Sequence, residues 1–416
     1  MKRTALLFLL ISTISFAQDN VAYKKFNSSQ LNTERIIKIY LPASYEENKE
    51  NTYPVAVVFD AEVLFDVYVA NSKMFAAVDE APEQIIVGIL QNQNKERNSD
   101  CDYSTDTGLP NEDSAKFYGF VVDELLPFID DNYRTSLFKT IVGNTLTANF
   151  ANYFFIDTYP PFNAYVNLNA SYADNIAEKL EAKTQNLSDI VFYYTCSGNY
   201  NSKKRRTKIN EVNNLLKLSE IHDFNYKFDN FENTSKTASI GQGIASSLGF
   251  IFEMFGAISI EEFDSEIAEL SPPEAIAYLE RKYVEIEYFF GSNKKIREQD
   301  VYRLESIIID KDNGDYLEEF GKMINRLYPD SPLGDYYIGL YYETGYDYKK
   351  ALKYYKNGYA KIGSDRENAD AYYENIERVL DKRRAQKLGF PVGEDTEEEA
   401  PKDAAPEEDP EKDNQD

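Results

Sequence analysis

The sequence contains few of the residues on which many enzymes depend. Its 416 residues include one histidine, His222, two cysteines, Cys101 and Cys196, and no tryptophan. A zinc site normally draws on several closely spaced His and Cys side chains, which this chain does not supply. No glycine-rich phosphate-binding loop is present either. We therefore expect no metal and no other cofactor, and we leave open whether Cys101 and Cys196 form one disulfide.

Long apolar runs are also missing. Lys2 and Arg3 precede a mostly apolar stretch at residues 5–14, which is too short to span a bilayer. Small residues follow at Ser15 and Ala17, so we expect a signal peptide of residues 1–17 that is cleaved before Gln18. No cysteine follows the cleavage site, so a lipid anchor is not expected. No later stretch reaches about 18 apolar residues, and we expect a soluble protein in the periplasm or otherwise exported.

Positive charge is scarce, because the formal net charge is −26. Residues 393–416 carry twelve acidic residues against two lysines. Such a chain repels phosphate backbones and anionic lipids, so nucleic acid is not an expected partner. Residues 389–416 are rich in Glu, Asp, Pro and Ala, and we expect this tail to be disordered.

Three short charged segments need an explanation. The basic run at residues 203–206 (KKRR) is interpreted as a solvated loop. Asp100, Asp102 and Asp106 lack the spacing of a calcium loop, so we interpret them as solvated as well. Lys95 and Arg97 could bind an anion, but exposed loop charges are the commoner case.

Between residues 18 and 257 short apolar runs alternate with helical patterns. The run VAVVF at 55–59 is typical of a strand that is buried on both faces. The expected strands are 35–41, 55–59, 84–90, 140–143, 164–167, 189–195 and 225–231, and the expected helices include 114–132 and 145–155. This alternation predicts an α/β domain with a mostly parallel sheet and helices on both faces.

From about residue 258 to 388 the pattern is helical throughout. The expected helices are 272–287, 296–309, 316–327, 336–347, 348–360 and 367–388. Small and large residues in the pair at 336–360 follow the spacing of one tetratricopeptide repeat: Ile338, Gly339, Tyr342, Ala351, Tyr355 and Gly358. Eleven tyrosines lie between Tyr336 and Tyr373, either packing between helices or facing a partner.

Several segments of the first domain resemble a known family. They are IYLPASY at 39–45, YPVAVVFDAE at 53–62, IIVGI at 85–89 followed by Asn94 and Arg97, and FVVDELLPFIDDNYR at 120–134. In this order they are similar to secreted esterases of the esterase-D and enterochelin-esterase type, over roughly residues 25–255. Relatives with a C-terminal tetratricopeptide-like domain are similar to the whole chain. The resemblance implies an α/β-hydrolase fold with a Ser-His-Asp triad.

The resemblance places the nucleophile elbow, G-x-S-x-G, at Gly143-Asn144-Thr145-Leu146-Thr147. Thr145 stands where the serine should be, and Thr147 replaces the second glycine of the motif. A β-branched residue fits the strained elbow conformation poorly, and Thr147 should crowd the helix against the strand. We therefore expect a relaxed turn.

The other two triad positions are also changed. No Asp or Glu follows the strand at 189–195 closely, and Asn199 or Asn201 takes the place of the acid. Thr234 is the positional match for the histidine. The single histidine, His222, precedes the last strand and should lie at the opposite edge of the sheet. The triad positions are thus degenerate at Thr145, Asn201 and Thr234, and we expect no catalytic residue.

We therefore expect an exported, catalytically inactive esterase-like protein that acts as a binding or scaffold subunit of a bacterial envelope complex. The helical domain would bind the partner, with at most a peripheral association with membrane. A signal peptide followed by Gln18 resembles those of Bacteroidota, and this resemblance suggests the type 9 secretion or gliding machinery. Two alternatives stay open: an unconventional esterase that uses Thr145, Ser171 or Ser197, and a small-ligand binder that reuses the hydrolase cleft.

Overall fold

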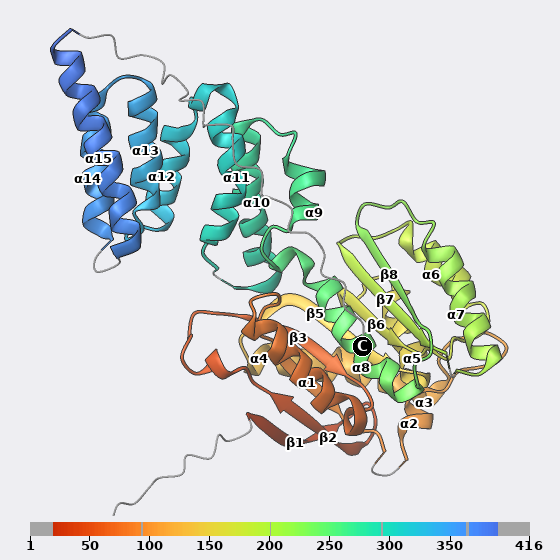
Figure 1. Ribbon diagram of the computed structural model, residues 1–416. Helices are drawn as coiled ribbons and strands as arrows, with labels where there is room; N and C mark the ends of the chain where they lie inside the picture. Colours follow the sequence, from red (N-terminus) through yellow and green to blue (C-terminus); the bar gives the residue numbers. More distant parts are fainter. Residues whose placement is uncertain (1–19, 93–94, 200, 293, 363–365, 390–416) are drawn as a thin grey trace, which may run out of the picture. The chain divides into compact units, whose positions relative to one another are not determined.

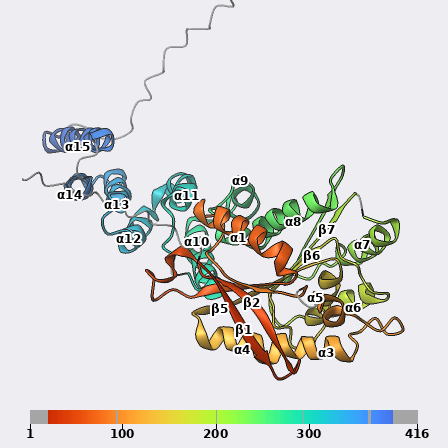
Figure 2. The same ribbon diagram turned by 90° about the horizontal axis from the view of Figure 1, so that it is seen from below.

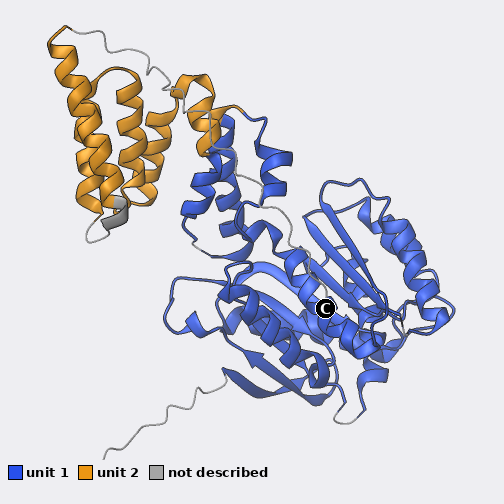
Figure 3. Ribbon diagram, in the orientation of Figure 1, with its two compact units in different colours: residues 1–270, 274–304 blue, residues 271–273, 305–416 orange. Residues whose placement is uncertain are grey.

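The protein is described from a computed structural model at residues 20–92, 95–199, 201–292, 294–362 and 366–389, with the backbone alone at 366–368. The predicted signal peptide and residues 390–416 of the predicted tail lie outside the described residues. Figure 3 shows two compact units, residues 1–270 with 274–304 and residues 271–273 with 305–416, which we describe one at a time.

Unit 1 is built on an eight-stranded sheet (Figure 1). Its strands are β1 (Val21–Ser28), β2 (Thr33–Tyr40), β3 (Tyr53–Val58), β4 (Ile85–Ile89), β5 (Thr135–Asn144), β6 (Ala164–Leu168), β7 (Val191–Gly198) and β8 (Phe224–Phe231). They are arranged in the order β1-β2-β4-β3-β5-β6-β7-β8. The β1–β2 and β2–β4 pairs are antiparallel, and all other pairs are parallel. The carboxyl ends of β3 to β8 therefore meet at one edge of the sheet, which we call the carboxyl edge.

Helices cover both faces of this sheet (Figures 1 and 2). The helices of the α/β part are α1 (Ala61–Ala77), α2 (Arg97–Cys101), α3 (Glu112–Gly119), α4 (Leu126–Asn132), α5 (Leu146–Phe155), α6 (Ile176–Thr184), α7 (Lys203–Leu216) and α8 (Lys236–Ile251). Helices α1 and α8 pack against each other on one face. Side chains of α3 to α7 form the large core on the other face. The predicted α/β-hydrolase-type fold, a mostly parallel sheet flanked by helices and followed by a helical region, is confirmed.

All seven expected strands are present. The structure differs from the sequence prediction at segments whose hydrophobic pattern is weak or interrupted. Strand β1 was not expected, because it is an edge strand whose side chains are mostly exposed and show little alternation. The expected helix at 114–132 is divided by a π-helical segment, Phe120–Leu125. Pro127 follows it and lacks the N–H that a continuous helix would use, so the widened turn absorbs this missing bond.

Three further helices, α9 (Ile260–Glu262), α10 (Pro272–Phe290) and α11 (Glu298–Asp310), follow the α/β part. Phe290 at the end of α10 is fully buried, and its ring lies 5.1 Å from that of Phe138 and 5.3 Å from that of Phe252. Unit 1 therefore extends to Leu304. The domain boundary expected at residue 257 is earlier than this, because the strand pattern ends there although the apolar packing continues.

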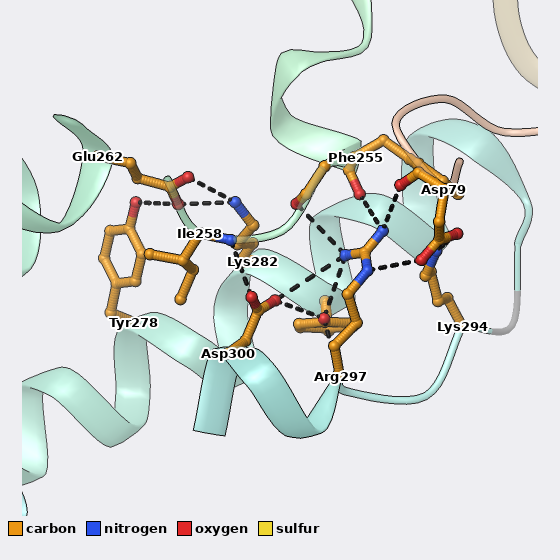
Figure 4. A network of polar contacts seen from close by, with 11 residues as sticks. Asp79, Phe255, Ile258, Glu262, Tyr278, Lys282, Lys294, Arg297 and Asp300 are labelled. Atoms are coloured by element: carbon orange, nitrogen blue, oxygen red, sulfur yellow. Dashed lines mark hydrogen bonds and ion pairs between the residues drawn. The ribbon is translucent and has the colours of Figure 1, made fainter. Parts of the chain in front are cut away.

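A polar network fixes the same segment, as Figure 4 shows. Arg297 donates to the carboxylate of Asp79, which follows α1, at 2.8 Å, and to the carbonyl oxygen of Phe255 at 2.6 Å. Asp300 accepts a hydrogen bond from the backbone N–H of Ile258 at 2.8 Å. The bonds join the start of α11 to the connection that leaves the α/β part.

Unit 2 contains the end of α11 and four further helices. They are α12 (Leu317–Leu327), α13 (Leu333–Thr344), α14 (Tyr348–Lys361) and α15 (Arg366–Lys387), and successive helices pack on each other. A Cβ atom on Gly339 would lie 2.6 Å from the ring of Tyr355, so a small and a large residue pack together here. The tyrosines are divided: Tyr337 and Tyr355 are buried, whereas Tyr346 and others are exposed. The interpretation as a tetratricopeptide-like repeat stays a prediction.

Five short segments complete the helical elements: 3₁₀ turns at Ala43–Tyr45, Glu253–Phe255 and Asp312–Gly314, and π-helical segments at Phe120–Leu125 and Phe263–Ile267. Within the described residues, no helix combines the length and apolar character that a bilayer crossing requires.

Candidate functional site

The turn between β5 and α5 has a strained backbone. Thr145 adopts φ 58° and ψ −104°, a region that a β-branched residue rarely occupies. Its N–H donates to the carbonyl oxygen of Leu168 at 2.9 Å, and its own carbonyl oxygen accepts from the N–H of Ser171 at 2.9 Å. The expectation of a relaxed turn is therefore wrong, because backbone bonds to the end of β6 and to the segment that follows it hold the elbow conformation.

Gly143 makes the close approach of α5 to β5 that the elbow requires. A Cβ atom there would lie 2.5 Å from the backbone carbon and oxygen of Thr147. Thr147 does not crowd the turn as expected. Its hydroxyl accepts from the N–H of Asn144 at 2.7 Å and donates to the carboxylate of Asp60 at 2.8 Å, so the side chain is part of the turn's hydrogen bonding.

The hydroxyl of Thr145 faces a cation. Arg97 donates through Nη2 to Thr145 Oγ1 at 3.0 Å and to the carbonyl oxygen of Asn144 at 2.9 Å. The same guanidinium binds the carboxylate of Asp60, with one bond of 2.9 Å. Burial opposes the charge of Arg97, yet its hydrogen bond with Asp60 raises its pKa above the ordinary value. Arg97 is therefore not the exposed loop charge we expected, whereas Lys95 is exposed.

Asn201, which we expect at the position of the triad acid, holds a second cation. Asn201 is buried, and its Oδ1 accepts from Nη1 of Arg205 at 3.0 Å. Its amide nitrogen donates to the carbonyl oxygen of Gly198 at 3.0 Å. Nε of Arg205 donates to the hydroxyl of Ser171 at 2.9 Å. Asn199 is exposed, and its side chain accepts from Arg206 at 3.3 Å.

We expected the basic run at residues 203–206 to be a loop, but it is helical. Residues 203–206 form the first turn of α7, which Ser202 caps by accepting from the N–H of Arg205. A helix gives successive side chains different directions, so Lys203 and Lys204 face solvent while Arg205 is directed toward Ser171. The sequence does contain a signal for this helix start. Ser202 lies three residues before Arg205, a spacing that is typical of a helix cap and would have predicted a helix here.

The positions expected for a general base do not place an imidazole at the elbow. Thr234 donates to the carbonyl oxygen of Glu232 at 3.2 Å. His222 lies before β8, at the opposite edge of the sheet, with its side chain 95% exposed and beside Asp223. Ser197 is buried, and its hydroxyl accepts from Asn201 at 3.4 Å. Among the described residues, the Thr145 hydroxyl thus contacts the donor Arg97, and none of these positions brings an imidazole to it.

The remaining predicted sites are not brought together. Cys101 and Cys196 are separate, buried free thiols, which settles the open question of a disulfide in this structure. The expectation of a solvated acidic segment is wrong for Asp100, which is buried and paired with Arg35, whereas Asp102 and Asp106 are exposed. The described residues contain no group of three or more metal-binding side chains. A cavity of about 550 Å³, lined in part by His222, lies at the opposite edge of the sheet, away from the elbow.

Comparisons with known proteins agree with this architecture. Residues 28–174 match the model of a family described as "Putative esterase". The uncharacterized protein YjcH of Bacillus subtilis (strain 168) is 25% identical over 180 residues, which are 42% of this chain and 71% of that protein.

Two solved structures resemble the chain over more of its length. An uncharacterised protein from Capnocytophaga ochracea DSM 7271 is 26% identical with a TM-score of 0.74, covering 87% of this chain and 99% of that one. An IroE-like serine hydrolase from Shewanella oneidensis is 19% identical with a TM-score of 0.53, covering 74% and 98%, and shows the fold alone. The chain is therefore similar to esterases over residues 28–174 and folds as an α/β-hydrolase-type protein with an added helical region.

Proposed function

We propose that this protein uses an esterase-type fold to bind a ligand without hydrolysing it. The observation that carries the proposal is the contact of Arg97 with the Thr145 hydroxyl, at 3.0 Å. A hydroxyl nucleophile needs a neighbour that accepts its proton, whereas a guanidinium only donates. The residue at the acid position, Asn201, likewise holds an arginine instead of an imidazole.

The test is an ester hydrolysis assay on the purified protein and on Thr145→Ala, with a series of activated acyl esters. We expect the rate with either protein to equal the background rate of the buffer. Thr145→Ser restores the usual nucleophile but no base, so it should also stay at background. Turnover by the unchanged protein that disappears in Thr145→Ala would refute the proposal.

One observation favours a second candidate, an esterase that uses Thr145. The turn keeps the elbow conformation at φ 58°, which presents a side chain at the carboxyl edge as a nucleophile would be presented. Similarity to the esterase family over residues 28–174 supports the same candidate. The assay above separates the two, because only an enzyme loses a measured rate in Thr145→Ala.

We further propose that the protein is exported and serves as a binding subunit of a bacterial envelope complex, with the type 9 secretion or gliding machinery as a candidate. Exposed tyrosines of the helical unit support a contact surface there, among them Tyr346, Tyr359 and Tyr373. Purification of the tagged protein from gently solubilised envelopes tests this. A partner at near-equal stoichiometry should be lost when these tyrosines are changed to serine, and recovery of the chain alone would contradict the proposal.

A further inference from the structure

The positive charge of Arg205 is not balanced by a neighbouring carboxylate among the described residues. Two of its donors are engaged by neutral oxygens, the hydroxyl of Ser171 at 2.9 Å and the amide oxygen of Asn201 at 3.0 Å. Within the described part of the chain, no carboxylate lies within ion-pair distance of it. Its side chain is half-buried, so solvent screens the charge only in part. Two neutral side chains thus hold the guanidinium in place and leave its other donors free to bind.

Two further cations lie near Arg205. Burial and the neighbouring charge of Arg97 lower the pKa of Arg205. Partial burial and the charges of Arg205 and Arg97 also lower the pKa of Lys236 at the start of α8, although Asp60 acts in the opposite direction. Asp60 is already bound by Arg97, so it does not neutralise the whole cluster. An anion between these groups would relieve their mutual repulsion.

A cavity of about 220 Å³ opens beside Arg205. Its lining includes Ser171, Lys204, Arg205, Lys208 and Asp174. Asp174 pairs with Lys208 at 3.2 Å, so Lys204 and Arg205 keep an excess of positive charge in the lining. Ser171 also connects the cavity to the elbow, because its N–H donates to the carbonyl oxygen of Thr145.

We propose that this cavity binds a small oxyanion, the carboxylate or phosphate group of a ligand, with Arg205 as its main contact and Lys204 as a second basic group of its lining. This inference rests on the proposed function, because the bound species is an acid and not an ester to be cleaved. Guanidinium groups bind planar or tetrahedral oxyanions through paired N–H donors, and Arg205 is pre-oriented for this by Ser171 and Asn201.

Calorimetric titration of the purified full chain with inorganic phosphate and, separately, with acetate tests the site, and neutral methyl acetate is the comparison ligand. We expect at least one anion to bind and the ester not to bind. The anion that binds more tightly identifies the ligand group as phosphate or carboxylate. Arg205→Gln should weaken its affinity about tenfold, since a charge-assisted hydrogen bond is lost.

Lys203→Gln is the matched control, because it removes one positive charge from the same helix turn at an exposed position outside the cavity lining. Its affinity should stay unchanged. Lys204→Gln is a second test variant, because Lys204 lines the cavity at an exposed position, and it should weaken binding even if Arg205→Gln fails to fold by circular dichroism. Absence of binding by both anions, or an equal loss in Lys203→Gln, would overturn the inference.

The same samples are assayed for ester hydrolysis, which keeps the two proposals separate. No hydrolysis together with no anion binding would overturn the oxyanion site alone. Hydrolysis that depends on Thr145 would overturn the non-hydrolytic function alone, while anion binding lost in Arg205→Gln would still establish the site.

Discussion

The backbone at Thr145 is held by groups that do not belong to its own side chain. Leu168 and Ser171 supply the partners of its N–H and carbonyl groups, and Gly143 supplies the space for α5. The elbow conformation therefore depends on backbone bonds and on one glycine, and it persists with a β-branched residue at φ 58°.

Gly143→Ala should destabilise unit 1 by about 2 kcal/mol, a typical value for overpacking. The added Cβ would lie 2.5 Å from backbone atoms of Thr147, which cannot move without shifting α5. Urea unfolding of the two proteins measures the difference.

Gly241→Ala is the matched control, because Gly241 lies in α8 and a Cβ there meets nothing within 4 Å. It should stabilise the protein by about 0.5–1 kcal/mol through helix propensity. If Gly143→Ala were as stable as the unchanged protein, α5 would not be held against β5 as described.

The sequence was enough to locate the elbow at Thr145, because this turn follows an apolar strand at a known spacing, while the assignment of altered triad positions stays a prediction. It was not enough to show which of 45 basic side chains approaches Thr145. Arg97 comes from the segment after β4 and Arg205 from the start of α7, so their meeting at the carboxyl edge depends on strand order. Local patterns do not encode such long-range contacts.

At the scale of elements, the contact between Asp79 and the segment just before α11 should make stability depend on pH. Burial alone would raise the pKa of Asp79, but its hydrogen bonds with Lys294 and Arg297 hold it below the ordinary value of 3.8. A carboxylate with a lowered pKa stabilises the fold above the pKa of the unfolded chain, and this contribution is lost as the pH falls through the folded pKa.

We therefore expect Asp79→Asn to reduce the free energy of unfolding by about 1 kcal/mol at neutral pH, since solvent screens a carboxylate that is more than half exposed. The difference from the unchanged protein should shrink below about pH 4. Urea unfolding at pH 7 and at pH 3 measures it. Asp66→Asn, which removes a carboxylate that is 81% exposed in its pair with Lys38, is the control and should change stability by less than about 0.5 kcal/mol. An Asp79 difference that is independent of pH would contradict the argument.

In the helical unit, Glu343 of α13 joins two other helices. Its buried carboxylate accepts from the hydroxyl of Tyr355 on α14 at 2.8 Å and from Arg378 on α15 at 2.9 Å. Burial would raise the pKa of Glu343, but Arg378 and Tyr355 together hold it below the ordinary value. The carboxylate is thus ionised at neutral pH and connects α13, α14 and α15.

Glu343→Gln should destabilise unit 2 by about 2 kcal/mol, because charge-assisted bonds to Arg378 and Tyr355 are replaced by weaker ones. Hydrogen exchange of backbone amides in α13 to α15 reports the loss as faster exchange. Glu374→Gln removes an exposed carboxylate from α15 and should leave the exchange rates unchanged. Equal rates in the two variants would show that Glu343 does not connect the helices.

Apolar elements were the more predictable ones. All seven expected strands contain buried runs, whereas the edge strand β1 and the first turn of α7 are polar and were not recognised. A hydrophobic pattern arises only where one face of an element is buried. Strand β1 and the first turn of α7 bury few side chains, so they show no such pattern. The same reason explains why Arg205 was interpreted as part of a solvated run.

At the scale of the whole molecule, the chain divides where packing stops and not where strands stop. The last strand ends at Phe231, but α10 still contributes Phe290 to the aromatic cluster with Phe138 and Phe252. The sequence pattern indicates whether a segment is a helix or a strand, but it does not indicate which hydrophobic core the segment packs into. The boundary expected at residue 257 therefore precedes the end of unit 1.

A chain that ends at residue 257 should therefore lose the cooperative unfolding of unit 1, whereas one that ends at residue 311 should keep it. The shorter chain lacks Phe290, and loss of a fully buried Phe side chain costs about 3–5 kcal/mol, a large part of the stability of one domain. It also exposes Phe138 and Phe252, so it should associate on size-exclusion chromatography. Phe290→Ala in the full chain should reproduce the loss of stability, while Tyr288→Ala, at a position that is 62% exposed on the same helix, should not. If the chain ending at 257 unfolded as steeply and at the same urea concentration as the one ending at 311, the α/β part would be complete without α10, and the earlier boundary would be the correct one.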